Sequence, residues 1–144
     1  MPNVLIIDDA VDICFLMKYI LKDLGIDADY VHTLSDAYIS LDKKKYSIIL
    51  LDNHLPDGIG IEHIQAIKKK TSGCRIVMVT AFDNNENKAT AIQRGADLFI
   101  GKPFSRETIS HCCTTQSFKK LFVGSLYRHL EPHTWRLFLL FYKT

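Results

Sequence analysis

Residues 48–58, IILLDNHLPDG, decide the fold class and raise the first functional question. Four apolar residues run without interruption into Asp52, and a turn through Pro56 and Gly58 follows at once. A short apolar run bounded by turn residues is typical of a strand that is buried on both faces of a parallel sheet. A carboxylate beside such a core is unfavourable unless a cation or a hydrogen-bond donor pairs with it. We therefore ask what the rest of the sequence places opposite Asp52.

Short apolar runs alternate with helical patterns on both sides of this stretch. The expected strands are residues 4–7, 28–32, 48–51, 76–79 and 98–100. The expected helices are residues 10–24, 35–44, 61–70 and 85–94, with a last helix that begins after Ser105. Ser35 and Ser105 are the expected N-caps, and Gly25 and Gly95 are the expected helix ends. Five such repeats predict an α/β fold with a parallel sheet covered by helices on both faces.

Polar side chains collect at the carboxyl ends of four of the five expected strands. They are Asp8 and Asp9 after the first strand, Asp52 after the third, Thr80 after the fourth and Lys102 after the fifth. Because parallel strands end at one edge of the sheet, we expect these side chains to lie close together. A single acid at a strand end is more often a cap or turn residue, which is how we interpret Asp12 and Asp57.

Each of these residue types has a use in phosphoryl transfer. Clustered carboxylates repel one another and need a cation, and their hard oxygen atoms suit Mg²⁺. A carboxylate beside such a cation can attack phosphorus and become an acyl phosphate. An ammonium group, a hydroxyl group and the metal can stabilise the charge on the transferred group. The pattern therefore predicts a phosphoryl-transfer site.

The motifs VLIIDD, IILLDNHLPDG, IVMVTA and GKPF resemble those of the receiver domain of bacterial two-component response regulators. The resemblance covers about residues 3–110 and is to a stand-alone, chemotaxis-regulator-like receiver. It implies a flavodoxin-like (βα)5 α/β fold, with a doubly wound, five-stranded parallel sheet in the order 2-1-3-4-5. We expect a receiver domain over residues 1–110 and an atypical extension of the last helix over residues 111–144, without a recognisable output domain.

The resemblance implies a role for each matching residue. Asp52 is the expected phospho-acceptor, and Lys102 and Thr80 are expected to contact the phosphoryl group. The expected Mg²⁺ ligands are Asp9, Asp52, the backbone carbonyl of His54 and, largely through metal-bound water, Asp8.

Further residues are implied in switching and timing. Thr80 and Phe99 are the expected switch pair, and plain core packing is the alternative for Phe99. The Lys102–Pro103 peptide bond is expected to be cis. His54 and Phe82 lie where the family tunes the phosphoryl lifetime. Both are bulky and are expected to crowd the hydrolytic water, unless His54 instead orients that water.

The implied function is that of a signalling phospho-acceptor and not of an enzyme with turnover. The phosphoryl donor would be a sensor histidine kinase or a histidine phosphotransfer protein. The signal would pass to a downstream protein through the face of the fourth helix, fifth strand and fifth helix, and a homodimer is a further option.

Two alternatives stay open beside this function. One is a pseudo-receiver or dimerisation scaffold. The other is a phosphatase of the haloacid dehalogenase type, which wants an acid two residues after its nucleophile. Here Ala10 follows Asp8 and His54 follows Asp52 at that spacing, which argues against the phosphatase.

The resemblance fades after about Ile109. The segment Cys112–Thr115 is a poor helix former, and Pro132 interrupts any later helix. The extension is either an interaction element, a truncated or out-of-frame remnant, or a minimal effector. A zinc site of Cys112, Cys113, His129 and His133 is disfavoured because the two cysteines are adjacent. No helix-turn-helix pattern is visible, so we expect no direct contact with nucleic acid.

Composition narrows the setting. The chain has 144 residues, of which 47% are hydrophobic and 24% charged, as expected for one globular domain. The formal net charge of +2 favours no particular partner. Four cysteines show no disulfide framework, and no signal peptide or run of 18 apolar residues is visible. We therefore expect a cytoplasmic protein without a membrane span.

Overall fold

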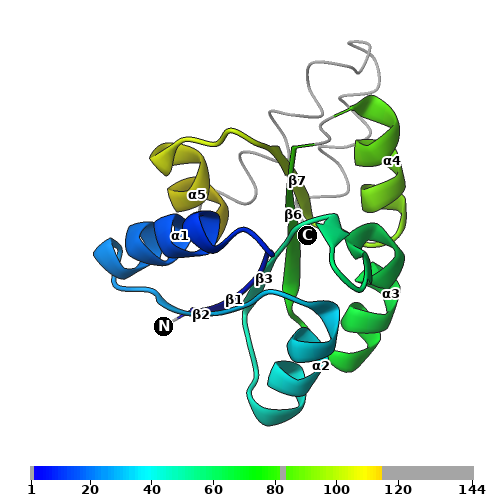
Figure 1. Ribbon diagram of the computed structural model, residues 1–144, viewed down its shortest axis with the longest axis horizontal. Helices are drawn as coiled ribbons and strands as arrows, with labels where there is room; N and C mark the ends of the chain where they lie inside the picture. Colours follow the sequence, from blue (N-terminus) through cyan, green and yellow to red (C-terminus); the bar gives the residue numbers. More distant parts are fainter. Residues whose placement is uncertain (1, 82–83, 115–144) are drawn as a thin grey trace, which may run out of the picture.

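Five parallel strands form one sheet in the computed structural model, which describes residues 2–81 and 84–114 (Figure 1). They are β1 (Asn3–Ile7), β2 (Asp27–Val31), β3 (Ile48–Leu51), β6 (Arg75–Thr80) and β7 (Leu98–Gly101). Their order across the sheet is β2-β1-β3-β6-β7, and every neighbouring pair is parallel. Because β6 and β7 are the fourth and fifth strands of this sheet along the chain, the predicted order 2-1-3-4-5 is confirmed.

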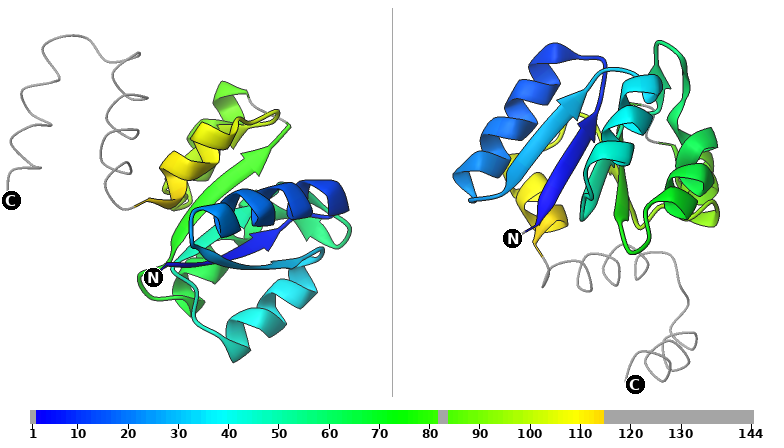
Figure 2. Two further views of the ribbon diagram at one scale, coloured as in Figure 1. Left: turned by 90° about the vertical axis from the view of Figure 1, so that its left-hand side faces the viewer. Right: turned by 90° about the horizontal axis from the view of Figure 1, so that it is seen from below.

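Helices cover both faces of the sheet (Figures 1 and 2). They are α1 (Val11–Asp23), α2 (Leu34–Lys43), α3 (Gly60–Lys70), α4 (Asn85–Gln93) and α5 (Arg106–Cys113). α1 and α5 pack on one face, and α2, α3 and α4 pack on the other. Within the described part of the chain, no helix combines the length and apolar character that a membrane crossing requires.

The apolar run of β3 is buried on both faces, as predicted. Ile48 and Leu50 belong to the core beneath α1 and α5, whereas Ile49 and Leu51 belong to the core beneath α2, α3 and α4. Side chains alternate between the faces of a strand, so a strand with helices on both sides needs an unbroken apolar run. Asp52 therefore follows a strand that is enclosed on both faces.

The first turn of α2 differs from the prediction. Thr33, and not Ser35, is the N-cap, because the Thr33 hydroxyl accepts a hydrogen bond from the Asp36 N–H at 3.0 Å. Ser35 lies inside the helix, and its hydroxyl donates to Asp57 at 2.8 Å. The Asp57 carboxylate also accepts from the backbone N–H groups of Leu34 and Ser35, each at 2.9 Å. Asp57 thus caps α2 from the loop that follows Asp52.

Two further elements were not predicted as they occur. The turn after Asp52 contains a small antiparallel hairpin of β4 (His54–Leu55) and β5 (Gly58–Ile59). Helix α5 continues to Cys113, although the segment from Cys112 was expected to be a poor helix former. Both cysteines are buried in the core shared with α1, and this burial outweighs their weak helix propensity. Residues 115–144, with Pro132 and the disfavoured zinc ligands His129 and His133, lie outside the described residues.

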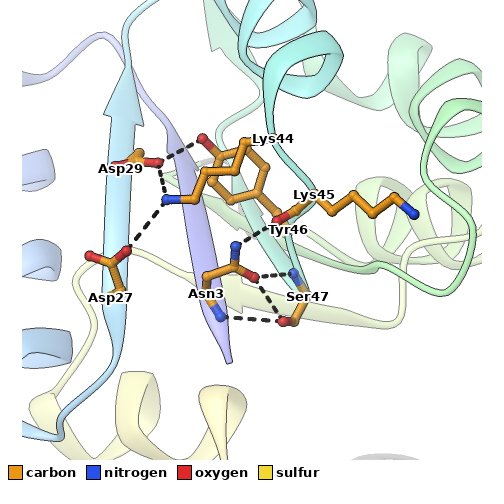
Figure 3. A network of polar contacts seen from close by, with 7 residues as sticks. All are labelled: Asn3, Asp27, Asp29, Lys44, Lys45, Tyr46 and Ser47. Carbon is orange, nitrogen blue, oxygen red and sulfur yellow. Dashed lines mark hydrogen bonds and ion pairs between the residues drawn. The ribbon is translucent and has the colours of Figure 1, made fainter. Parts of the chain in front are cut away.

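A polar network fastens the edge strand β2 and the start of β1 to the loop before β3 (Figure 3). Asp29 of β2 accepts a hydrogen bond from the Tyr46 hydroxyl at 2.7 Å and pairs with Lys44 at 3.0 Å. The Asn3 side chain accepts from the backbone N–H and the hydroxyl of Ser47, each at 3.0 Å. These contacts lie at the amino end of β1 and along β2 as far as its middle residue, Asp29, so they hold the sheet together without entering its carboxyl edge.

Gly60 provides a test of how closely α3 approaches the end of β3. Its N–H donates to the Asn53 carbonyl at 2.7 Å, and a Cβ atom here would lie 2.2 Å from the Asp52 carbonyl oxygen. We predict that Gly60→Ala lowers the free energy of unfolding by about 1–3 kcal/mol, because the backbone must shift. The control is Gly73→Ala, at φ +79° with no atom within 4 Å, which introduces backbone strain alone. Urea unfolding should show a larger loss for Gly60→Ala, and equal losses would contradict the close approach.

Candidate functional site

The strand ends bring an acidic cluster, a lysine and a threonine to one edge of the sheet. The acidic cluster comprises Asp8, Asp9 and Asp52, whose carboxylate oxygen atoms lie within 4.8 Å of one another. The Lys102 Nζ atom lies 2.6 Å from Asp8 Oδ2 and 3.5 Å from Asp52 Oδ2. Thr80 ends β6, the strand between β3 and β7. The predicted set thus meets at this edge.

The backbone holds these residues just beyond the regular strands. Hydrogen bonds between neighbouring strands fix the main chain where the functional side chains branch off. Three of them are Asp8 N–H to the Val31 carbonyl (3.1 Å), Asp52 N–H to the Ile7 carbonyl (2.9 Å) and Lys102 N–H to the Thr80 carbonyl (2.8 Å). The Lys102–Pro103 peptide bond is cis. Rigid strands therefore position the side chains of the candidate site.

The acidic cluster has a buried floor and an open side. Asp8 is 1% exposed, Asp52 is 7% exposed and Thr80 is 1% exposed, whereas Asp9 is exposed. One carboxylate oxygen of Asp52 is held in place, because Oδ1 accepts a hydrogen bond from the Asn53 N–H at 2.8 Å. A solvated cation can therefore approach from the side of Asp9 while the deeper carboxylates keep their orientation.

The described residues do not fully compensate the negative charge of Asp52. Burial, and next the negative charge of Asp8, raise the pKa of Asp52 above its ordinary value. The ammonium group of Lys102 and the Asn53 N–H oppose this rise without cancelling it. Among residues 2–81 and 84–114, one ammonium group thus faces three carboxylates, and this edge of the sheet favours an additional cation.

The donor set fits a hard divalent cation such as Mg²⁺. Its groups are carboxylate oxygens, and one of them, Asp9, is open to solvent. Mg²⁺ keeps several waters and takes few protein carboxylates, which suits a partly exposed site of this kind. The side chain of His54, whose backbone carbonyl was an expected ligand, is exposed in β4. The chemistry of the site therefore agrees with the expected metal.

The other residues singled out in the sequence have varied positions. Phe99 lies in β7 opposite Met78 of β6 and packs, half-buried, against the core beneath α2, α3 and α4. Phe82, the second residue expected to tune the phosphoryl lifetime, lies outside the described residues. The side chain of His54 is exposed, and His54 follows Asp52 by two residues in the sequence.

Two residues near the site were missed by sequence reasoning. Asn53 is 5% exposed, and its side-chain oxygen accepts the Ile61 N–H at 3.0 Å, which ties α3 to the end of β3. A polar residue directly after a buried acid was the available signal. His32 contacts the backbone carbonyl of Asp8 with Nδ1 at 2.8 Å. Nothing in the sequence marks that contact, because its partner is a backbone atom.

Comparison with known proteins places this fold and site in a family. The sequence matches the response regulator receiver domain over residues 4–113. It is 30% identical over 107 residues to the uncharacterized transcriptional regulatory protein YclJ of Bacillus subtilis (strain 168). That match covers 74% of this chain and 47% of YclJ, so the chain spans about half the length of this relative.

Solved structures agree with this assignment. A two-component response regulator from Clostridium difficile is 27% identical with a TM-score of 0.77, over 83% of this chain and 97% of that one. The beryllofluoride-activated NtrC4 receiver domain dimer is 29% identical with a TM-score of 0.77, over 83% of this chain and 98% of that one. By sequence, fold and the residues at its sheet edge, the chain belongs to the response regulator receiver domain family of two-component systems.

Proposed function

We propose that this receiver domain accepts a phosphoryl group on Asp52 from a phosphohistidine of a sensor kinase or phosphotransfer protein. The observation that carries the proposal is the undercompensated Asp52 carboxylate, which lies 3.5 Å from the Lys102 ammonium group and beside Asp8 and Asp9. A structural acid would be expected to have its charge matched by its neighbours. An acid that accepts a phosphoryl group needs a cation site and a second positive group beside it.

In the proposed transfer, an Asp52 carboxylate oxygen forms a bond to phosphorus while the bond from phosphorus to the donor imidazole nitrogen breaks. The electron pair of that bond stays on the imidazole. Asp8, Asp9, Asp52 and the His54 carbonyl would hold Mg²⁺, which supplies charge neutralisation for the transferred group. Lys102 stands closer to Asp8 than to Asp52, and we propose that its ammonium group moves towards the phosphoryl oxygen atoms.

The signal would then leave through a change in packing. Thr80 would contact a phosphoryl oxygen, and Phe99, on the neighbouring strand, would follow the change at Thr80. Half-burial of Phe99 supports this role, because a half-buried ring can repack with little loss of core. The shift in population between the packing without the phosphoryl group and the packing with it would alter the face formed by α4, β7 and α5. That face is the proposed contact for a downstream protein.

We propose that the domain acts in the cytoplasm and catalyses only its own phosphorylation and dephosphorylation. Residues 1–110 would form the receiver, with residues 111–144 as its extension. The NtrC4 relative was solved as a dimer, which supports self-association as a second form of output.

The first test is phosphorylation by a small phosphodonor with Mg²⁺, followed by intact-protein mass. Wild type should gain one phosphoryl group, because the Asp52 carboxylate lies beside Asp8 and Asp9 and 3.5 Å from the Lys102 ammonium group. Asp52→Asn should gain none. Asp12→Asn is the matched control, since Asp12 is an exposed acid in the first turn of α1. Equal labelling of wild type and Asp52→Asn would remove Asp52 from its proposed role.

The second test is stabilisation by Mg²⁺ alone. At a concentration 100 times its dissociation constant, Mg²⁺ should raise the free energy of unfolding by about 2.7 kcal/mol. Asp9→Asn removes one donor, and a site that binds tenfold more weakly gains about 1.4 kcal/mol less. Thermal melts with and without Mg²⁺ measure both effects, with Asp12→Asn again as control. If Asp9→Asn gained as much as wild type, Asp9 would not be a ligand.

The third test is the pH dependence of stability without Mg²⁺. The pKa of Asp52 is raised from its ordinary 3.8, so its destabilising effect begins as the pH rises above 3.8 and is complete above the raised pKa. Asp52→Asn should therefore be more stable than wild type at pH 7, and the gain should vanish in acid.

The pH dependence expected for Asp57 has the opposite sign, so Asp57→Asn serves as the control. Hydrogen bonds from the backbone N–H groups of Leu34 and Ser35 lower the pKa of Asp57, so its contribution is present at neutral pH and is lost as the pH falls through the lowered pKa. Asp57→Asn should be less stable than wild type at pH 7. Urea unfolding between pH 3 and pH 8 measures both variants, and a stability loss for Asp52→Asn at pH 7 would contradict the account.

A further inference from the structure

The backbone carbonyl of Asp8 receives two side-chain hydrogen bonds from other elements. His32, which follows the last residue of β2, places Nδ1 2.8 Å from this oxygen. Cys14 of α1 places Sγ 3.2 Å from it. The preceding carbonyl, that of Ile7, is paired within the sheet by the Asp52 N–H. His32 and Cys14 therefore supply donors at the point where the regular ladder ends.

The chemistry of the carbonyl decides the state of both side chains. A carbonyl oxygen only accepts hydrogen bonds, so the His32 ring must carry a proton on Nδ1. Cys14 is completely buried, and its burial, followed by the charge of Asp8, raises the pKa of its thiol to about 11. The thiol thus keeps its proton and donates it to the same oxygen.

These two donors orient the peptide that joins Asp8 to Asp9. The peptide is planar, so fixing its carbonyl fixes the direction in which Asp9 leaves it. The Asp8 N–H donates to the Val31 carbonyl at 3.1 Å, and the Ala10 N–H donates to Asp8 Oδ1 at 2.9 Å. With His32 on the carbonyl, the main chain around both acids is held from several directions.

We propose that His32 is a positioning residue for the acidic cluster. Its Nδ1–H group holds the Asp8–Asp9 peptide so that the two carboxylates already face Asp52 before a cation arrives. This inference rests on the proposed function, because it concerns the same metal and phosphoryl site. Side chains that orient ligands without touching the metal change metal affinity by roughly 10–100-fold when they are removed.

A packing role for the ring has to be separated from a hydrogen-bonding role. The His32 ring lies against Tyr30, with ring centroids 5.4 Å apart. His32→Phe keeps an aromatic ring against Tyr30 and removes the donor. His32→Asn removes the ring and keeps an N–H donor near the position of Nδ1. The two variants therefore give opposite results under the two roles.

The experiment measures the Mg²⁺ dissociation constant of the full chain by calorimetry for wild type and both variants. His32→Phe should bind Mg²⁺ at least tenfold more weakly than wild type, and His32→Asn should stay within about threefold of it. The ¹⁵N shifts of the wild-type ring, recorded without Mg²⁺ at a pH where the ring is neutral, should show the proton on Nδ1.

Three results would overturn the proposal: unchanged Mg²⁺ affinity in His32→Phe, an equal loss in both variants, or a ring proton on Nε2 in wild type. Its failure is distinguishable from that of the proposed function. If wild type gains no phosphoryl group on Asp52, the function fails. If wild type gains it and His32→Phe binds Mg²⁺ normally, only the positioning role fails.

Discussion

In the part of the chain that the structure describes, one ammonium group faces three carboxylates at the carboxyl edge of the sheet, and the other features of the candidate site depend on that imbalance. Lys102 is shared between Asp8 and Asp52 and lies closer to Asp8. Burial and the charge of Asp8 consequently leave Asp52 with a raised pKa. A bound cation would reduce the repulsion among these carboxylates. A phosphoryl group attached to Asp52 would change which negative groups Lys102 pairs with. The same charge imbalance would therefore favour both the proposed metal binding and the proposed response to phosphorylation.

The fold can accommodate these uncompensated charges because contacts away from the site stabilise the strands that bear the charged residues. β3 is buried on both faces, so the end of this strand cannot move away from the neighbouring acids without disturbing the packing of the core on each face of the sheet. Gly60 and Asn53 bring α3 against the end of the strand. The polar network around Asp29 and Tyr46 fastens the middle of β2 to the loop before β3, away from the site (Figure 3). The fold is thus stabilised by contacts outside the site, whereas the negative charges within the site are not fully compensated by the described residues.

The parts that were predictable from sequence are those set by local pattern. An apolar run such as residues 48–51 reveals a buried strand, and parallel strands necessarily bring their carboxyl ends together. The prediction of Ser35 as the N-cap of α2 is wrong because Thr33 and Ser35 can both cap a helix, and the choice depends on Asp57 in a distant loop. The reach of α5 to Cys113 was underestimated because burial outweighs propensity. The contact of His32 with Asp8 has a backbone atom as its partner, and no residue letter records it.

The most direct test of the central claim is to locate the phosphoryl group chemically. An acyl phosphate of aspartate is reduced by borohydride to homoserine, which survives digestion and can be assigned by peptide mass sequencing. After treatment with a small phosphodonor and Mg²⁺, the account predicts homoserine at position 52 and unmodified aspartate at positions 8 and 9. Homoserine at position 8 or 9, or a phosphorylated protein that yields none, would contradict it.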